Sequence, residues 1–164
     1  MQTQQVTPRM TFVNLLERNK PQAVAWVSGL SGSTLSGMVK FYATPFQGVL
    51  VEAEIFNLPD ANMAGNFYAL HIHEHGDCSD SFMKAGGHYN PAGQPHPEHA
   101  GDMIPILGNQ GYAWMSFYTK RFSIKDIIGR SVIIHAKPDD FTTQPSGNAG
   151  QMIGCGVIQS DSTF

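Results

Sequence analysis

Residues 48–56 read GVLVEAEIF, and this stretch alternates between two kinds of side chain as a half-buried β-strand does. Val49, Val51, Ala53 and Ile55 fall on one face, whereas both glutamates fall on the opposite face. Shorter strand-like runs lie on either side of it, at residues 23–27, 37–42, 68–75, 112–119, 131–135 and 153–158. Short strands at this spacing, with turn residues rather than helices between them, predict an all-β antiparallel sandwich or barrel.

The composition is that of one globular domain. The chain has 164 residues, of which 41% are hydrophobic and only 14% charged, so a disordered chain is excluded. A net charge of −3 supplies no basic footprint, and we therefore expect no binding to nucleic acid. No apolar run approaches the roughly 20 residues that span a bilayer, so no membrane segment is expected.

The first 21 residues are expected to form an N-terminal extension to a domain that comprises residues 22–164. Within the extension, residues 11–20 predict a short helix with Thr11 as its N-cap, and Pro21 would end it. The first ten residues lack both a basic start and an apolar segment, so they do not resemble a signal peptide. This predicts a cytoplasmic protein, or a secreted or periplasmic one if an upstream export segment has been removed.

Two long loops interrupt the strand pattern, at residues 76–101 and 138–150. Loops longer than about 12–15 residues are usually functional or disordered. Six of the seven histidines lie between positions 71 and 99, in or beside the first of these loops. Such a cluster next to a carboxylate indicates a zinc or copper site, since imidazole and carboxylate are ligands of these metals.

His71 and His73 occupy positions i and i+2 of an expected strand, so their side chains point to the same face. With a third imidazole from another strand they could form a nitrogen-rich site suited to Cu(II). His75 would share that face if the strand continued, but Gly76 and Asp77 predict a turn there. We therefore expect His75 to be exposed or to form a hydrogen bond.

A second pattern, H-x7-H-x2-H-x2-D, is formed by His88, His96, His99 and Asp102. Three imidazoles and one carboxylate suffice for a closed tetrahedral zinc site. The alternative is a flexible histidine-rich loop with only adventitious affinity for metals.

The chain resembles the copper–zinc superoxide dismutase family in five segments, which occur in the order LHIHEHGDCSD, AGGHYNP, HPEHAGD, IIGRSVIIHAKPDD and PSGNAGQMIGCGVI. The resemblance extends from about Gln22 to the C-terminus. It implies an eight-stranded Greek-key β-barrel with two long loops that form a metal site on its outside.

The resemblance also implies which residues bind the two metals, namely His71, His73, His88 and His135 for copper and His88, His96, His99 and Asp102 for zinc. The four copper-binding histidines would be the catalytic residues, with His88 bridging the two metals as an imidazolate. Asp139 would link a copper-binding histidine to a zinc-binding one, because a carboxylate that accepts the outer N–H fixes the orientation of the ring.

The two cysteines allow at most one disulfide within the chain, and two free thiols are the expectation for a reducing cytosol. The resemblance instead implies a disulfide between Cys78 and Cys155 that encloses about 78 residues. In the chain-entropy view, such a bond contributes roughly 4–5 kcal/mol to stability.

The activity implied by the resemblance is dismutation of superoxide, the expected partner, into O2 and H2O2 by one copper ion that alternates between Cu(II) and Cu(I). His88 would bridge the metals in the oxidised state and carry a proton in the reduced state. Zinc would stay bound and orient His88 without changing its own redox state. Relatives occur as monomers and as dimers, and the sequence is compatible with a homodimer.

The chain departs from the family at Met152, where the last motif usually has an arginine that attracts and positions the anion. Arginine is permanently charged, whereas methionine has neither charge nor donors. We therefore expect turnover about tenfold to a hundredfold slower, which is roughly 1.4–2.7 kcal/mol at the barrier. In one interpretation Met152 is an apolar filler and Lys137 or another cation supplies the charge, and in the other its thioether lies near copper.

The remaining charged residues give little argument for function. Residues 141–147 carry no charge, which again predicts weak steering of an anion. We expect a solvated face formed by Lys120, Arg121, Lys125 and Arg130.

The alternative function is a non-enzymatic copper- and zinc-binding protein of the same fold, which stores or delivers copper.

Overall fold

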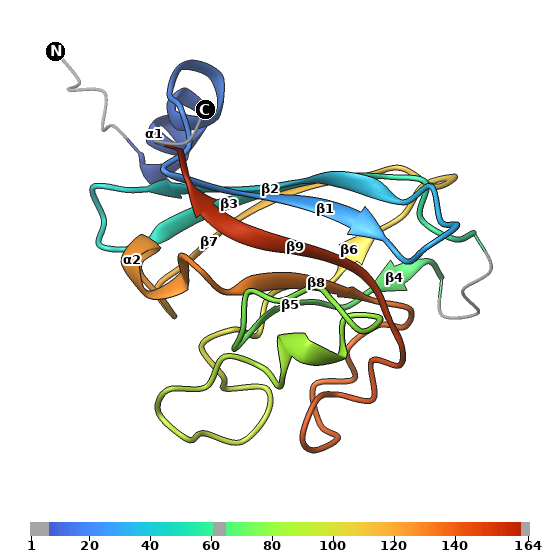
Figure 1. Ribbon diagram of the computed structural model, residues 1–164. Coiled ribbons are helices and arrows are strands. Elements are labelled where there is room, and N and C mark those ends of the chain that lie inside the picture. The colour runs from blue at the N-terminus through green and yellow to red at the C-terminus, as the bar shows by residue number, and fades with distance from the viewer. Residues whose placement is uncertain (1–6, 61–64, 162–164) are drawn as a thin grey trace, which may run out of the picture.

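The computed structural model describes residues 7–60 and 65–161. Within these ranges the chain forms a curled seven-stranded antiparallel sheet, a separate pair of short strands and two α-helices (Figure 1). The main sheet runs in the order β5 (Leu70–His73), β8 (Ser131–His135), β9 (Met152–Ser160), β1 (Ala23–Gly29), β2 (Ser36–Ala43), β3 (Val49–Phe56) and β7 (Ala113–Thr119). The short pair consists of β4 (Phe67–Tyr68) and β6 (Ile106–Leu107). The predicted antiparallel, barrel-like β fold is confirmed.

The alternation of β3 determines how the sheet faces its core. Val49, Val51, Ala53 and Ile55 are at most 2% exposed and belong to one hydrophobic cluster. Their neighbours in sequence, the two glutamates, face outward and accept hydrogen bonds from aromatic side chains of the loop before β7 and of β7 itself. Because a shift of one residue would expose the whole apolar face, burial fixes the register of β3 against β2 and β7.

The N-terminal helix, α1 (Pro8–Arg18), begins earlier than predicted. Its N-cap is Thr7, and the predicted N-cap Thr11 lies inside the helix, so that prediction is wrong. The physical reason is the proline in the first turn, where a residue without an N–H is well tolerated. Phe12 stacks on Tyr118 of β7 with the ring centroids 5.1 Å apart, which packs the helix against the sheet.

The second helix, α2 (Ile124–Ile127), is a single turn before β8. Ser123 and Asp126 form a capping box, in which each side chain bonds to the other residue's backbone N–H. In the described part of the chain, neither α-helix has the length and apolar character needed to cross a membrane.

Both long loops lie beside β5 and β8, on the side of the sheet away from β2 and β3 (Figure 1). The first loop is bound to β5 by a cycle of backbone hydrogen bonds of 2.8–2.9 Å that joins Ile72, Tyr89 and Gly101. A side chain on Gly101 would collide with the carbonyl of Ile72, so this close approach requires glycine. The strand itself ends at His73, earlier than predicted, because the N–H of Glu74 donates to the loop carbonyl of Gly87.

A disulfide between Cys78 and Cys155 joins the first loop to β9 and confirms the pairing that the family resemblance implied. It borders a small apolar cluster formed by Phe82, Ala85 and Ile133. Ala85 belongs to a short 3-10 helix, η1 (Met83–Ala85), which the cluster holds against the sheet. The disulfide and the cluster together fix the part of the loop that leads to the histidines.

Replacement of both cysteines by serine should lower the free energy of unfolding by about 2–5 kcal/mol, because the bond restricts a long loop of the unfolded chain. Chemical denaturation of the oxidised wild type and of the Cys78→Ser/Cys155→Ser variant would measure the difference. A reductant should reproduce the loss in the wild type and leave the double variant unchanged. Equal unfolding midpoints for the oxidised wild type and the variant would contradict this expectation.

Candidate metal centre

Two groups of buried side chains, each able to hold a metal ion, meet at one shared histidine. The first group is His71, His73, His88 and His135, and the second is His88, His96, His99 and Asp102. Within each group the candidate ligand atoms lie within 4.8 Å of one another. The sheet supplies His71 and His73 from β5 and His135 from the end of β8. His88 and the rest of the second group come from the first long loop and the residue that follows it.

The hydrogen bonds of His73 and His135 determine which ring nitrogen of each carries the proton. His73 Nδ1 donates to the carbonyl of Gly86 at 2.8 Å, and His135 Nδ1 donates to that of Gly150 at 3.2 Å. In a neutral ring the other nitrogen then has a free lone pair. These two Nε2 atoms face each other at 3.3 Å, which is an arrangement that a metal ion between them would satisfy.

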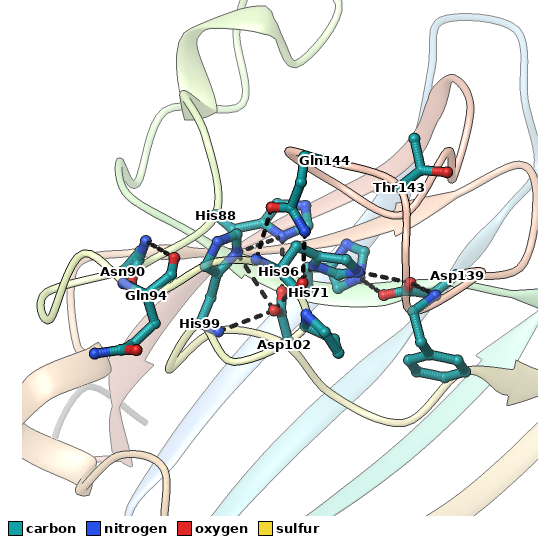
Figure 2. Close-up of polar contacts among 12 residues, drawn as sticks. His71, His88, Asn90, Gln94, His96, His99, Asp102, Asp139, Thr143 and Gln144 are labelled. Atoms are coloured by element: carbon teal, nitrogen blue, oxygen red, sulfur yellow. Dashed lines mark hydrogen bonds and ion pairs between the residues drawn. The ribbon is translucent and has the colours of Figure 1, made fainter.

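Asp139 fixes the protons of two further rings in the same way (Figure 2). His71 Nε2 donates to its Oδ2 at 2.8 Å, and His96 Nε2 donates to its Oδ1 at 2.7 Å. Nδ1 of each ring is buried without a hydrogen bond, although His96 Nδ1 lies 3.0 Å from an oxygen of Asp102. Both lone pairs are therefore directed toward the candidate metal positions rather than toward the protein.

His88 stands between the two groups. Its Nδ1 lies 2.7 Å from Asp102 Oδ1 and 3.3 Å from His99 Nδ1, on the side of the second group. Its Nε2 is buried with no hydrogen-bond partner. The ring centroid lies 4.0 Å from that of His71, so the one imidazole faces both groups.

Burial keeps the imidazoles of His71, His73 and His135 neutral. It is the largest cause that lowers the pKa of His73 to about 2 and that of His135 to about 3, and it also lowers the pKa of His71. A neutral ring is the form that binds a metal, since proton and metal compete for one lone pair. Burial alone would raise the pKa of Asp139, but its hydrogen bonds with His71 and His96 lower the pKa well below the usual range.

The two donor sets suit two different metals. Four imidazole nitrogens form a nitrogen-rich set that suits copper. Three imidazoles with one carboxylate form the set of a closed zinc site. Unpartnered buried nitrogens on His71, His88 and His96 support this fit, because a buried polar atom without a partner is costly unless a ligand satisfies it.

A cavity of about 660 Å3 leads from the surface to the first group. Its walls include His73, His88 and His135, together with Glu74 and Met152. Of the described residues that line it, none is a lysine or an arginine. The carboxylate among the described lining residues is that of Glu74, whose side chain is 49% exposed.

Met152 faces two environments. It pairs with His135 across β8 and β9, next to an irregularity in the register, and it lines the cavity. It also packs against the apolar cluster beside the disulfide.

Lys137, the predicted replacement for the missing arginine, is exposed and does not line the cavity. Its methylene groups lie over Gly150. A compensating role for its charge stays a prediction.

Arg121 and Arg130, which we expected to belong to a solvated face, instead hold the loops. Nη1 of Arg121 donates to the carbonyl oxygens of Pro97, His99 and Asp102 at 2.7, 3.3 and 3.3 Å. The guanidinium of Arg130 lies 3.7 Å from the ring centroid of Tyr89. It donates hydrogen bonds to the backbone carbonyls of Asp126 and Glu74. Arg121 is exposed as expected and Arg130 is half-buried, but the expectation missed their contacts with the loops, because such contacts leave no periodic pattern in the sequence.

Gln144 is a further contact that the sequence did not indicate. Its Oε1 accepts from the N–H of His96 at 2.9 Å, and its Nε2 donates to the carbonyl of the same residue at 2.6 Å (Figure 2). One side chain of the second long loop therefore binds the backbone of a candidate ligand in the first long loop.

His75 lies outside both groups, and its side chain is 65% exposed.

Comparison with known proteins gives consistent matches. The family model described as copper/zinc superoxide dismutase (SODC) matches residues 35–158. Cu-Zn superoxide dismutase 2 of Aquifex aeolicus is 39% identical over 129 residues, which cover 68% of this chain and 72% of that protein. Cu-Zn superoxide dismutase A of Xenopus laevis is 33% identical over 145 residues, which cover 79% and 93%.

Two further matches differ in how much of each chain they cover. The extracellular Cu-Zn superoxide dismutase of Rattus norvegicus is 37% identical over 100 residues, but the match spans only 41% of that protein and 56% of this chain. The crystal structure of a double mutant of a SOD-like protein from Bacillus subtilis has a TM-score of 0.71 at 27% identity, covering 84% of this chain and 97% of that one.

Asp139→Asn should weaken zinc binding by about 10–100-fold, because one of the two rings loses the acceptor that fixes its proton. Competition with a chromophoric chelator would measure the zinc affinity. Asp140→Asn is the matched control, since Asp140 accepts hydrogen bonds from Thr142 and Thr143 and bonds to no histidine. Equal losses in both variants would mean that the charge of the loop, and not the orientation of the rings, sets the affinity.

Arg121→Met should release zinc about tenfold faster, because three carbonyls of the ligand-bearing loop lose their common donor. The rate of zinc transfer to a chelator in stopped flow would test this. Lys120→Met removes an equal charge from the adjacent exposed position and should release zinc as the wild type does. An unchanged rate in Arg121→Met would show that the loop keeps its conformation without this contact.

Proposed function

Because the chain belongs to the copper/zinc superoxide dismutase family, we propose that it dismutes superoxide at a copper centre supported by zinc. The observation that carries the proposal is the convergence of free ring nitrogens on two neighbouring points that share His88. A flexible histidine-rich loop would not bury the histidine rings. Nor would it fix the outer ring protons, which His71 and His96 donate to Asp139 and which His73 and His135 donate to backbone carbonyls.

In this proposal each metal has its own set of ligands, with copper held by His71, His73, His88 and His135 and zinc by His88, His96, His99 and Asp102. When bound, copper would supply one-electron chemistry, by which one superoxide is oxidised to O2 and a second, with two protons, is reduced to H2O2. Zinc would contribute charge and orientation without redox change.

His88 is the proposed proton carrier. Its Nε2 is buried without a partner, so no other described residue occupies the position where a proton would be held. Zinc, held on the side of the opposite nitrogen where Asp102 also lies, would keep the ring oriented while that proton is gained and lost. The ring also lines the cavity, which allows the proton to be passed directly to a bound substrate.

The cavity supports the proposal of slow turnover. An anion is attracted when the walls of a cleft carry positive charge, and rates near the diffusion limit depend on this attraction. Here the walls lack lysine and arginine and include Glu74. Superoxide would therefore reach the copper position without steering, and its capture would limit the rate.

Met152→Arg should raise kcat/KM for superoxide by about tenfold to a hundredfold at low ionic strength, because it restores a positive charge on the cavity wall. The gain should shrink as salt is added, whereas the wild type should respond weakly to salt. Pulse radiolysis, expressed per bound copper, would give both rates.

Met38→Arg is the matched control, since it adds the same charge on β2, where Met38 pairs with Trp26 and Glu54 and does not line the cavity. It should leave kcat/KM close to the wild-type value. If neither the wild type nor Met152→Arg turns over superoxide with both metals bound, dismutation is the wrong function. The alternative, a protein that stores or delivers copper, would then be supported.

A further inference from the structure

The wall of the cavity carries two thioethers. Met83 in η1 is 65% exposed, which is the largest exposure among the large hydrophobic residues of the described chain. Met152 lies at the start of β9, paired with His135. Both side chains line the same cavity as His73, His88 and His135, so soft sulfur donors and imidazole nitrogens share one opening.

The chain positions Met83 by an unfavourable backbone. The three residues before it, Asp80, Ser81 and Phe82, have φ values of 54°, 51° and 73°, in the left-handed region that side chains other than glycine rarely adopt. Such strain persists only where the surrounding structure imposes it, and it concentrates at functional sites. Phe82, the last of these residues, is buried in the apolar cluster beside the disulfide, and the exposed Met83 follows it at the cavity.

The lining of the cavity does not exclude a cation. Glu74 is a carboxylate on its wall, and no described lysine or arginine lines it, although Lys137 lies over the lining residue Gly150. Thioether sulfur selects Cu(I) over harder cations, and it has no proton to lose when a metal binds. The lining of the cavity therefore offers thioether sulfurs that can bind Cu(I), in the same cavity as the imidazoles of the first group.

We propose that Met83 and Met152 form a Cu(I) acquisition site, from which univalent copper passes to His73 and His135. The passage is an exchange of ligands: two sulfur–copper contacts are replaced by nitrogen–copper contacts, and no electron or proton is transferred. The proposal rests on the copper position inferred above, and it explains why a methionine occupies a wall position where an arginine would repel the incoming ion.

The test is the transfer of Cu(I) to zinc-loaded, copper-free protein from bathocuproine disulfonate without oxygen, followed by the loss of colour of the complex. The Met83→Leu/Met152→Leu variant should take up Cu(I) about tenfold more slowly than the wild type, because leucine keeps the shape and removes the sulfur. Met38→Leu, on β2 and outside the lining of the cavity, should match the wild type. Equal rates for wild type and double variant would overturn the proposal.

A second measurement separates this proposal from the copper centre itself. In ¹³C-methyl-methionine protein, an equimolar amount of Ag(I), a redox-inert substitute for Cu(I), should shift the methyl signals of Met83 and Met152 and leave that of Met38 in place. The shifts should persist in His73→Ala/His135→Ala protein, where the imidazole site is lost. Unshifted signals in both proteins would overturn the acquisition site, whereas failure of the wild type to bind Cu(II) would count against the copper centre alone.

Discussion

The candidate metal centre depends on one buried carboxylate. Asp139 accepts hydrogen bonds from His71 in one group and His96 in the other, so a single side chain fixes the protonation of one ring in each group. Its own position requires Gly147, because a side chain there would collide with the carboxylate, and it accepts the N–H of Phe141 at 2.7 Å. The second long loop is thus ordered around this carboxylate, and the rings are ordered by the loop.

This arrangement connects the stability of the fold to the chemistry of the site. The sheet has a continuous apolar core, whereas the two loops are held by hydrogen bonds, the disulfide and the small cluster around Phe82. Burying several imidazoles with unpartnered nitrogens opposes folding of the loops, and bound metal would remove that penalty. The sheet can therefore be complete while the loops take their final order from the metals.

The sequence predicted those features that leave a local pattern. Alternation along β3 predicted its buried face, and the family motifs predicted the disulfide pairing and which side chains come together in the two groups, whereas metal binding by these groups stays a prediction. Contacts between distant loops leave no such pattern, and for that reason Arg121 and Gln144 were not recognised as residues that hold the ligand loop. The N-cap at Thr7 was missed because a polar residue nearer the apolar pattern offered an equally plausible start.

The charge of the cavity could not be derived from the sequence either, since it depends on where side chains lie and not on their number. Lys137 is close to the metal centre along the chain, yet its methylenes cover Gly150 and it does not line the cavity. Met152, by contrast, faces the cavity because its partner across the strands is His135. A residue at this position therefore bears on both proposals: an arginine would favour an anionic substrate, and a methionine favours univalent copper. If both proposals hold, weak attraction of superoxide and efficient uptake of Cu(I) would be two consequences of the same side chain.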